Sequence, residues 1–411
     1  MSDGSPTASV GRVGSTDPEV RVSGERVPLP PAARLGWRSG AVVGARAVLA
    51  VLPAWIVARV VVTAALVFAH VGVRSLRPDN PAAVQRVHQG LLSWDGGWYR
   101  SIALHGYVGA GQESLRFFPL FPLLGRWFGL VPGVGTDVAL VVVANVSALL
   151  AMAALLVLVR HDLGDAALAR RSVWLLALAP SAYCFVLGYA DALLMLCAVV
   201  TFLGARTGRW WWAAAAGLAA GAVRPVGVLL VVPVLVELWL RRRESARPAR
   251  WVARVAALAG PVVGAGAYLA WVAHRFGDAW LPFTVQQQDG HRGQFAVPVS
   301  AMAHDVMEGL HGHHLGSAVH VPWVLVCIVL AVVAWIRLPR SYALFAVAVL
   351  VVSLSSTNLD SFERYALGAF PLVIAASTAT SSRRVEVVVL GLSALAMGAY
   401  AVLGFVGVVV P

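Results

Sequence analysis

Residues 138–159 have the sequence VALVVVANVSALLAMAALLVLV, without a single charged residue. A helix needs about 20 mostly apolar residues to cross the roughly 30 Å hydrocarbon core of a bilayer. This stretch meets that requirement, and the rest of the chain resembles it. Of the 411 residues, 59% are hydrophobic and only 13% are charged, whereas soluble domains average about 45–50% and about 25%. The composition therefore indicates a membrane protein and argues against a water-soluble enzyme.

Similar apolar stretches follow one another to the C-terminus and predict an all-α polytopic fold with about eleven transmembrane helices. The predicted spans are 47–72, 138–159, 172–187, 190–205, 210–223, 225–240, 255–273, 322–336, 341–355, 365–380 and 387–409. Residues 1–40 are rich in Ser, Pro, Gly and Arg and predict a disordered tail. We expect a single transmembrane domain over residues 41–411, without a cleaved signal peptide ahead of it.

The formal net charge of +12 comes from 32 basic residues, all of them arginine, and 20 acidic residues. Such a charge can indicate nucleic-acid binding, but here most arginines gather in short segments between predicted spans. These are Arg160, Arg170 and Arg171; Arg206 and Arg209; Arg241, Arg242, Arg243, Arg247, Arg250 and Arg254; Arg337 and Arg340; Arg383 and Arg384. With eleven spans, all five segments share the side of the N-terminal tail. Because short arginine-rich loops stay inside, we predict a multi-pass plasma-membrane protein with a cytoplasmic N-terminus and no nucleic-acid partner.

Two long segments, about 73–137 and 274–321, fall on the opposite, extracytoplasmic side. The first is rich in aromatic, His and acidic residues, which indicates an ordered loop. The apolar pairs 172–205 and 210–240 are too short for two full spans each, so their tips should stop below the outer surface. Asp191 and Arg224 lie at these tips. Since lipid does not tolerate charges at that depth, we expect the tips to line a cavity open to the outside.

The first long segment contains Ser-Trp-Asp-Gly-Gly-Trp-Tyr at positions 93–99. Asp95 is a candidate general base, because aromatic neighbours desolvate a carboxyl group and raise its pKa toward the working range. Its structural alternative is the N-cap of a helix. Glu113 is a second candidate carboxylate. Its structural alternative is a solvated acidic residue in a loop. Apolar faces for stacking against a sugar or a lipid chain come from Trp94, Trp98 and Tyr99.

Several motifs occur in a fixed order along the chain. They are Trp94-Asp95 with Trp98-Tyr99, Glu113, Phe117-Phe118-Pro119-Leu120-Phe121-Pro122, Pro180-Ser181, Gly188-Tyr189-Ala190-Asp191, Gly208-Arg209-Trp210-Trp211, Arg224-Pro225, Ser361-Phe362-Glu363-Arg364-Tyr365 and Phe370-Pro371-Leu372. In this order they resemble the bacterial relatives of the phosphatidylinositol-glycan class V (PIG-V) mannosyltransferases, over about residues 45–380. The resemblance implies a GT-C-like bundle, a polyprenyl-phosphate sugar donor used on the outer face, and Asp95 as the catalytic acidic residue.

A polyprenyl-phosphate sugar needs a cation at the boundary between membrane and water. Arg224 and Arg364 are the candidates, since arginine donates bidentately to phosphate and stays charged. The alternative for either is a structural salt bridge, with Glu363 or Asp360 as the partner of Arg364. The remaining substrate-binding candidates are Asp191 and Tyr365.

The predicted reaction is inverting transfer of mannose, with Asp95 removing the proton of an acceptor hydroxyl while the arginines hold the leaving phosphate. A retaining reaction would instead use Glu113 or Asp191 as a nucleophile. The alternative function is a transporter or flippase for a lipid-linked substrate. The acceptor is open: a glycolipid, a glycan or a protein.

No cofactor is expected. His304, Glu308 and His311 would share one helical face and could hold a divalent metal ion, but we favour a polar surface there. Arg59 lies in the middle of the first predicted span. A charge at that depth needs an interior partner, and Asp191 or Glu237 is expected to provide it.

Overall fold

The computed structural model describes residues 37–76, 80–243, 248–288, 292–297 and 320–410. The chain divides into two units, 1–34 and 35–411, and all described residues lie in the second. Helix α1 begins at Trp37, inside the predicted tail 1–40, whose other residues lie outside the described ranges.

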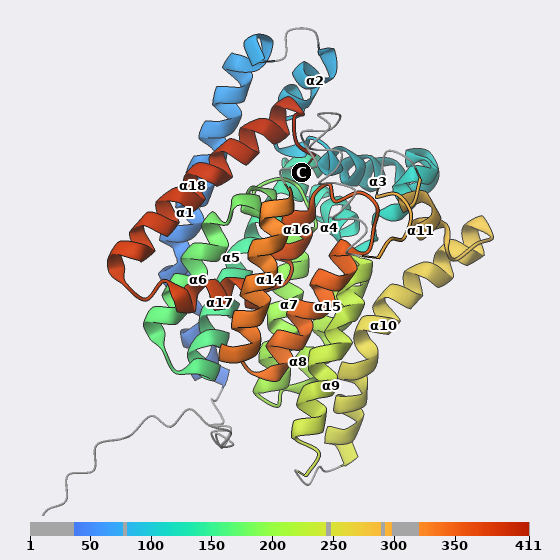
Figure 1. Ribbon diagram of the computed structural model, residues 1–411. Coiled ribbons are helices and arrows are strands. Elements are labelled where there is room, and N and C mark those ends of the chain that lie inside the picture. Colours follow the sequence, from blue (N-terminus) through green and yellow to red (C-terminus); the bar gives the residue numbers. More distant parts are fainter. Residues whose placement is uncertain (1–36, 77–79, 244–247, 289–291, 298–319, 411) are drawn as a thin grey trace, which may run out of the picture. The chain divides into compact units, whose positions relative to one another are not determined.

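The regular structure of the described residues is helical throughout, without a β-strand, which confirms the predicted all-α class (Figure 1). The elements are α1 (Trp37–Leu76), α2 (Pro81–Gln89), η1 (Gly90–Leu92), α3 (Asp95–Ala110), η2 (Gln112–Arg116), α4 (Leu120–Gly129), α5 (Gly135–Leu163), α6 (Ala166–Leu178), η3 (Pro180–Phe185), α7 (Asp191–Arg206), α8 (Trp210–Val223), η4 (Pro225–Leu230), α9 (Val231–Leu240), α10 (Pro248–Phe276), α11 (Leu281–Gln286), α14 (His320–Arg337), α15 (Arg340–Leu354), α16 (Phe362–Leu367), α17 (Phe370–Ala379) and α18 (Arg383–Val406).

In the part of the chain that the structure describes, four helices are long and apolar enough to cross a membrane. They are α1, α5, α10 and α18, with mean hydropathies between 1.7 and 2.6 over their most apolar windows. Of the other predicted spans, five coincide with shorter helices, namely 190–205, 210–223, 225–240, 322–336 and 341–355, so the count of eleven stays a prediction.

Two predicted spans are interrupted. The span 172–187 ends as a helix at Leu178, because Pro180 follows and starts the short helix η3. The span 365–380 is divided between α16 and α17, where Pro371 occupies the first turn of the second helix.

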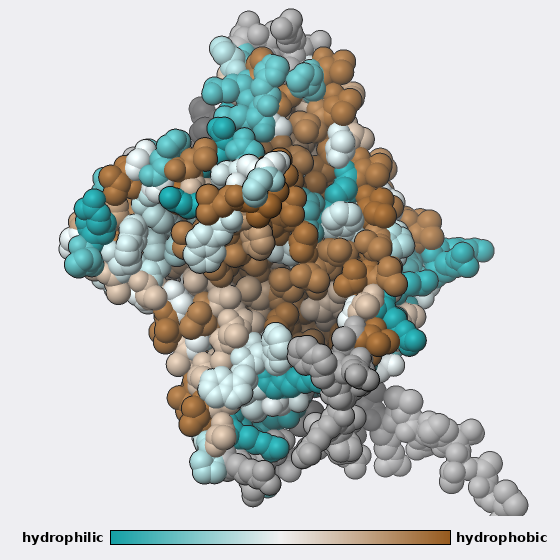
Figure 2. Space-filling view, turned by 180° about the vertical axis from the view of Figure 1, so that it is seen from behind, coloured by the Kyte–Doolittle hydropathy of each residue, from teal (hydrophilic) through white to brown (hydrophobic). Residues whose placement is uncertain are grey.

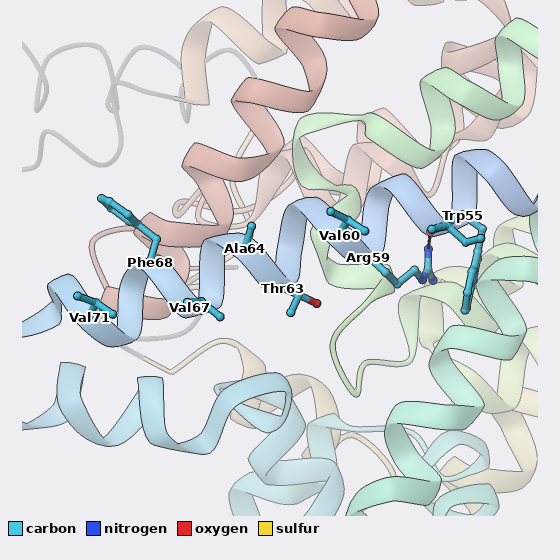
Figure 3. Close-up of a pocket in the computed structure, with 9 residues that line it drawn as sticks. Trp55, Arg59, Val60, Thr63, Ala64, Val67, Phe68 and Val71 are labelled. Atoms are coloured by element: carbon cyan, nitrogen blue, oxygen red, sulfur yellow. Dashed lines mark hydrogen bonds between the residues drawn. The ribbon is translucent and has the colours of Figure 1, made fainter.

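The outer faces of the long helices are apolar. In α18 only 17% of the most apolar window is buried, whereas in the central helix α5 the value is 56%. Figure 2 shows hydrophobic residues over the middle of one face, with hydrophilic residues gathered toward its upper and lower ends. An open apolar groove follows α1, with Trp55 and Arg59 at one end and Val71 at the other (Figure 3). Exposed apolar surface of this extent matches contact with lipid chains.

Arg59 does not pair with Asp191 or Glu237, so that expectation is wrong. Its Nε donates to Asn145 Oδ1 at 2.8 Å, and its Nη2 donates to the Phe185 carbonyl at 3.2 Å. Neutral acceptors therefore satisfy the mid-helix arginine. These hydrogen bonds tie α1 to α5 and to the end of η3.

A buried polar network joins the ends of α5, α7, α9 and α15. Asp162 Oδ2 accepts hydrogen bonds from Arg206 Nε and the Tyr342 hydroxyl, both at 2.6 Å. Glu237 Oε1 accepts from Arg206 Nη1 at 3.0 Å and from Ser341 Oγ at 2.8 Å. This network thus gathers at one end several of the arginine-rich segments that the sequence placed on one side.

Helices α8 and α10 pack backbone to backbone across small residues. A Cβ atom at Gly264 would overlap the Leu218 carbonyl oxygen, and one at Gly221 would overlap the Pro261 carbonyl oxygen. Close helix approach through glycine is a common way to join helices in lipid, where apolar side chains gain little by packing together.

We expect Gly264→Ala to destabilise this helix pair, because the methyl group would force the two backbones apart. Overpacking of this kind costs about 1–3 kcal/mol. The measurement is the thermal unfolding temperature in detergent, which should fall. Gly266→Ala is the matched control: a Cβ at that glycine of the same helix meets nothing within 4 Å, so stability should hold or rise slightly. Equal stability of the two variants would contradict the close packing.

Candidate active site

Four charged residues meet at one end of the helix bundle: Asp95, Asp191, Arg224 and Arg364. The carboxylates begin α3 and α7, where the helix dipole favours negative charge. Arg224 ends α8 in an extended conformation, as expected for a residue before proline, and Arg364 lies in α16. Helix α7 runs from Asp191 to Arg206, so these four residues and the arginine-rich network lie at opposite ends of that helix.

The four residues form one ion-pair cluster. Arg364 Nη2 donates to Asp95 Oδ2 at 2.7 Å, and Arg224 Nη2 donates to Asp191 Oδ2 at 2.9 Å. The cross pairs are longer, at 3.9 Å between Arg224 Nη2 and Asp95 Oδ2 and 3.7 Å between Arg364 Nε and Asp191 Oδ1. Each carboxylate therefore faces both guanidinium groups. The structure brings together four sequence candidates from four separate segments.

Arg364 pairs with Asp95 and not with Glu363 or Asp360, so the partners expected for it are wrong, although both arginines of the cluster do form salt bridges. The carboxylate of Glu363 is instead 2.8 Å from His320 Nδ1. Adjacent residues on a short helix point in different directions, and Glu363 and Arg364 therefore contact different neighbours.

Most of the cluster is buried, and Asp95 is its most accessible member, with 21% of its side chain exposed. Arg364 has two buried donors, Nε and Nη1, that lack a hydrogen-bond acceptor among the described residues. An unsatisfied buried donor costs about 1–3 kcal/mol, and more when the group is charged. An anionic ligand entering beside Asp95 would supply the missing acceptors.

The backbone is strained next to both members of the Asp95–Arg364 pair. Among the described residues, only Trp94 and Ser361 have positive φ without being glycine, at 57° and 63°. They are the N-caps of α3 and α16, so Asp95 is the first helical residue and the N-cap alternative for it is wrong. Such conformations persist where the surroundings enforce them, often at functional sites.

The pKa of Asp95 is lowered, contrary to the sequence-based expectation. Burial does act to raise it, but the charges of Arg364, Arg224 and Arg116 outweigh burial, and the hydrogen bond from Arg364 adds to them. Asp95 is therefore ionised at neutral pH and can accept a proton. The sequence showed the aromatic neighbours of Asp95 but could not show that distant arginines lie against it.

The aromatic candidates around Asp95 mostly pack against or hydrogen-bond to neighbouring residues and so hold the start of α3 in place. The ring of Tyr99 is 1% exposed and packs edge-on against Phe117 and Phe121, so it offers no open face. Trp94 donates its indole N–H to the Gly404 carbonyl at 2.8 Å. Trp98 is half-buried and stacks on Phe117.

Tyr365 is surrounded by arginines. Its ring centroid is 4.4 Å from the guanidinium carbon of Arg292, 5.3 Å from that of Arg364 and 5.7 Å from that of Arg224. Sequence reasoning missed Arg292, because an Arg-Gly pair in a long loop gives no local signal of what it contacts. Glu113, the second candidate carboxylate, lies exposed in η2, outside the ion-pair cluster.

A narrow cavity of about 40 Å³ opens at the cluster, enough for a few water molecules. Charged and aromatic residues line it together with apolar residues from α7, η4 and α15. The lining includes Asp191, Arg224, Arg364 and Tyr365, and Leu194, Met195, Ala198, Val226, Leu230, Phe345 and Val349. A cavity thus lies at the hairpin tips, as expected, and its opening to the outside stays a prediction.

The metal alternative falls outside the described residues, since His304, Glu308 and His311 all lie in the undescribed range 298–319. The ranges that the structure describes contain no group of three His, Cys, Asp or Glu residues placed to hold a metal ion.

The chain is distantly similar to several solved structures, including the following two. ArnT from Cupriavidus metallidurans, solved with undecaprenyl phosphate, is 16% identical with a TM-score of 0.48, over 81% of this chain and 62% of that one. The Archaeoglobus fulgidus oligosaccharyltransferase, solved with zinc and sulfate, is 12% identical with a TM-score of 0.41, over 83% and 53%. The chain thus spans less than two thirds of either protein. No curated protein matches the sequence.

Residues 118–359 match the model of glycosyltransferase family 87. The matched range is more than half of the chain, and it includes Asp191, Arg224 and Arg292 but not Asp95 or Arg364. The narrower likeness to PIG-V mannosyltransferases stays a prediction. The length of the match is sufficient for assignment: the chain belongs to glycosyltransferase family 87.

Proposed function

We propose that this protein is an integral-membrane glycosyltransferase of GT-C type that moves mannose from a polyprenyl-phosphate donor to an acceptor hydroxyl on the extracytoplasmic face. The observation that carries the proposal is the ion-pair cluster, three of whose members, Asp191, Arg224 and Arg364, line a cavity together with apolar residues. A proton acceptor and phosphate-binding cations there lie in direct contact. Family membership supports the reaction class, and the PIG-V resemblance supports mannose.

In the proposed step, the acceptor oxygen attacks the anomeric carbon of mannose while its proton passes to the Asp95 carboxylate. The bond between that carbon and the phosphate oxygen breaks, and polyprenyl phosphate leaves with one more negative charge than the donor carried. Arg224 and Arg364 stabilise this developing charge. Attack from the side opposite the leaving group inverts the configuration.

The contact between Asp95 and Arg364 links the two halves of this reaction. While Asp95 is ionised, it holds Arg364 Nη2 at 2.7 Å. Protonation of Asp95 removes its charge, and the guanidinium charge of Arg364 becomes available to the leaving phosphate at that moment. Asp191 remains bound to Arg224 and acts as a positioning residue. A nucleophilic role for Asp191, as in a retaining enzyme, would have to use Oδ1, since Oδ2 accepts the hydrogen bond from Arg224.

The two ends of α7 support an extracytoplasmic position for the site. The arginine-rich segments gather around Arg206 and Glu237, and the ion-pair cluster lies at the other end of the helix. Because basic segments favour the cytoplasm, this arrangement supports a cluster that faces outward, where its substrates are a lipid-linked sugar and an acceptor in the bilayer or the cell envelope.

Purified protein in detergent should turn over radiolabelled polyprenyl-phosphate mannose, either by hydrolysis or by transfer to a lipid extract. The measurement is loss of label from the donor. Turnover of another polyprenyl-phosphate sugar but not of the mannose form would contradict the sugar assignment. Uptake into proteoliposomes without any turnover would favour the transporter alternative.

Asp95→Asn should lower transfer by about 10²- to 10⁴-fold, the usual contribution of general base catalysis, while expression and membrane insertion stay normal. Asp137→Asn is the matched control. Asp137 forms a comparable 2.6 Å contact with Arg100, but it is 50% exposed and lies outside the cluster, so transfer should persist. Near-full activity of Asp95→Asn would exclude Asp95 as the base.

The activity profile against pH should show no acid limb from Asp95 above about pH 4, because the arginines hold its pKa below the usual carboxyl range. In Arg364→Gln, the charge that lowers the pKa of Asp95 most is removed. Burial then raises that pKa against a smaller opposing effect. The acid limb of the residual activity should therefore move to higher pH. An identical limb in wild type and variant would show that Arg364 does not control the protonation of Asp95.

A further inference from the structure

Arg292 is fixed beside the ion-pair cluster by its own backbone. Its amide N–H donates to the Gln286 carbonyl at 3.1 Å, and its carbonyl accepts from the Asn358 amide at 3.1 Å. The Thr357 amide donates to the Gln294 carbonyl at 3.0 Å. A short segment after α11 is thus paired with the connection between α15 and α16.

The residue after Arg292 allows this path. Gly293 has φ +70°, and a Cβ atom there would overlap Thr357 Oγ1. Glycine is the residue that adopts such a conformation without steric cost. The arginine is therefore held at a defined place.

The Arg292 guanidinium has only neutral acceptors among the described residues. Its Nη2 donates to the Ser353 carbonyl at 2.6 Å and to Ser356 Oγ at 2.9 Å. Its Nε is buried without a hydrogen-bond acceptor in the same part of the chain. Within the described ranges, no carboxylate therefore forms an ion pair with this arginine.

The other two arginines differ in this respect. Arg224 donates to Asp191 and Arg364 donates to Asp95, so the cluster by itself is neutral. With Arg292, which lies against the same Tyr365 ring as Arg364, the group carries one positive charge in excess. A phosphodiester carries one negative charge.

We propose that Arg292 is a third phosphate-binding residue of the donor site. Its buried Nε and the Nε and Nη1 of Arg364, which lack a hydrogen-bond acceptor among the described residues, are the donors for the phosphate oxygens, while Nη2 of Arg292 stays bound to Ser353 and Ser356. The inference rests on the proposed function, since it concerns the phosphate of the same lipid-linked donor. In this proposal the excess positive charge of the site belongs to Arg292, a loop residue that takes no part in proton transfer.

The test measures binding of undecaprenyl phosphate to purified protein, by the shift of the thermal unfolding temperature against ligand concentration. Undecaprenol, which has the same chain without phosphate, is the reference ligand. We expect wild type to bind the phosphate in preference to the alcohol. Arg292→Gln should bind it at least tenfold more weakly, the usual effect of losing a hydrogen bond from a charged group.

Arg275→Gln is the matched control, because Arg275 is an exposed arginine in the last turn of α10 and its loss should leave binding unchanged. Arg292→Lys is the second variant. A lysine keeps the charge but cannot hold Ser353 and the phosphate together, so it should bind several-fold more weakly than wild type. It keeps the proposal testable if Arg292→Gln does not fold.

The outcomes separate the two claims. If wild type binds the phosphate and the Arg292 variants bind it equally well, the role of Arg292 is wrong and the proposed donor class stands. If wild type does not distinguish the phosphate from the alcohol, the proposed donor class fails and the inference fails with it. Weaker binding that appears only with a lowered unfolding temperature of the ligand-free variant would mean that Arg292 supports the fold and does not bind phosphate.

Discussion

The hydrogen bond between Arg364 and Asp95 joins positions 269 residues apart, and the candidate site depends on it. It lowers the pKa of Asp95 against the effect of burial, so the carboxylate is ionised at neutral pH. It also holds Arg364, which lines the cavity, in place. One contact therefore sets both the protonation state of the proposed base and the position of the cation that would receive the leaving phosphate.

This contact requires unusual backbone on both sides. Trp94 and Ser361 have positive φ, and each comes just before the short helix that carries one partner. The hairpin tips supply the other half of the cluster, because α7 begins at Asp191 and α8 ends at Arg224. Short helices that stop at charged residues are costly in lipid unless they line a cavity. Here the same breaks bring the four charges together.

Several features could be predicted from the sequence because they depend on local composition. The apolar runs predicted the helices, and Pro180 and Pro225 explain where two of them end. Pairing was less predictable. Arg364 bonds to Asp95 and not to its neighbour Glu363, and Arg59 is satisfied by Asn145 and a backbone carbonyl. Which side chains meet across a bundle depends on helix rotation and packing, and neither is encoded in a short motif.

The sequence by itself determined that the chain is a helical membrane protein and identified Asp95, Asp191, Arg224 and Arg364 as the charged residues to examine. It also predicted that the arginine-rich segments share one side of the membrane. Hydropathy and residue order are sufficient for these conclusions. The tertiary structure decided how those residues pair, lowered the pKa of Asp95 where the sequence had suggested a rise, and added Arg292. The reason is physical: the sign of a pKa shift and the net charge of a site depend on distances between groups that the folded chain alone brings together.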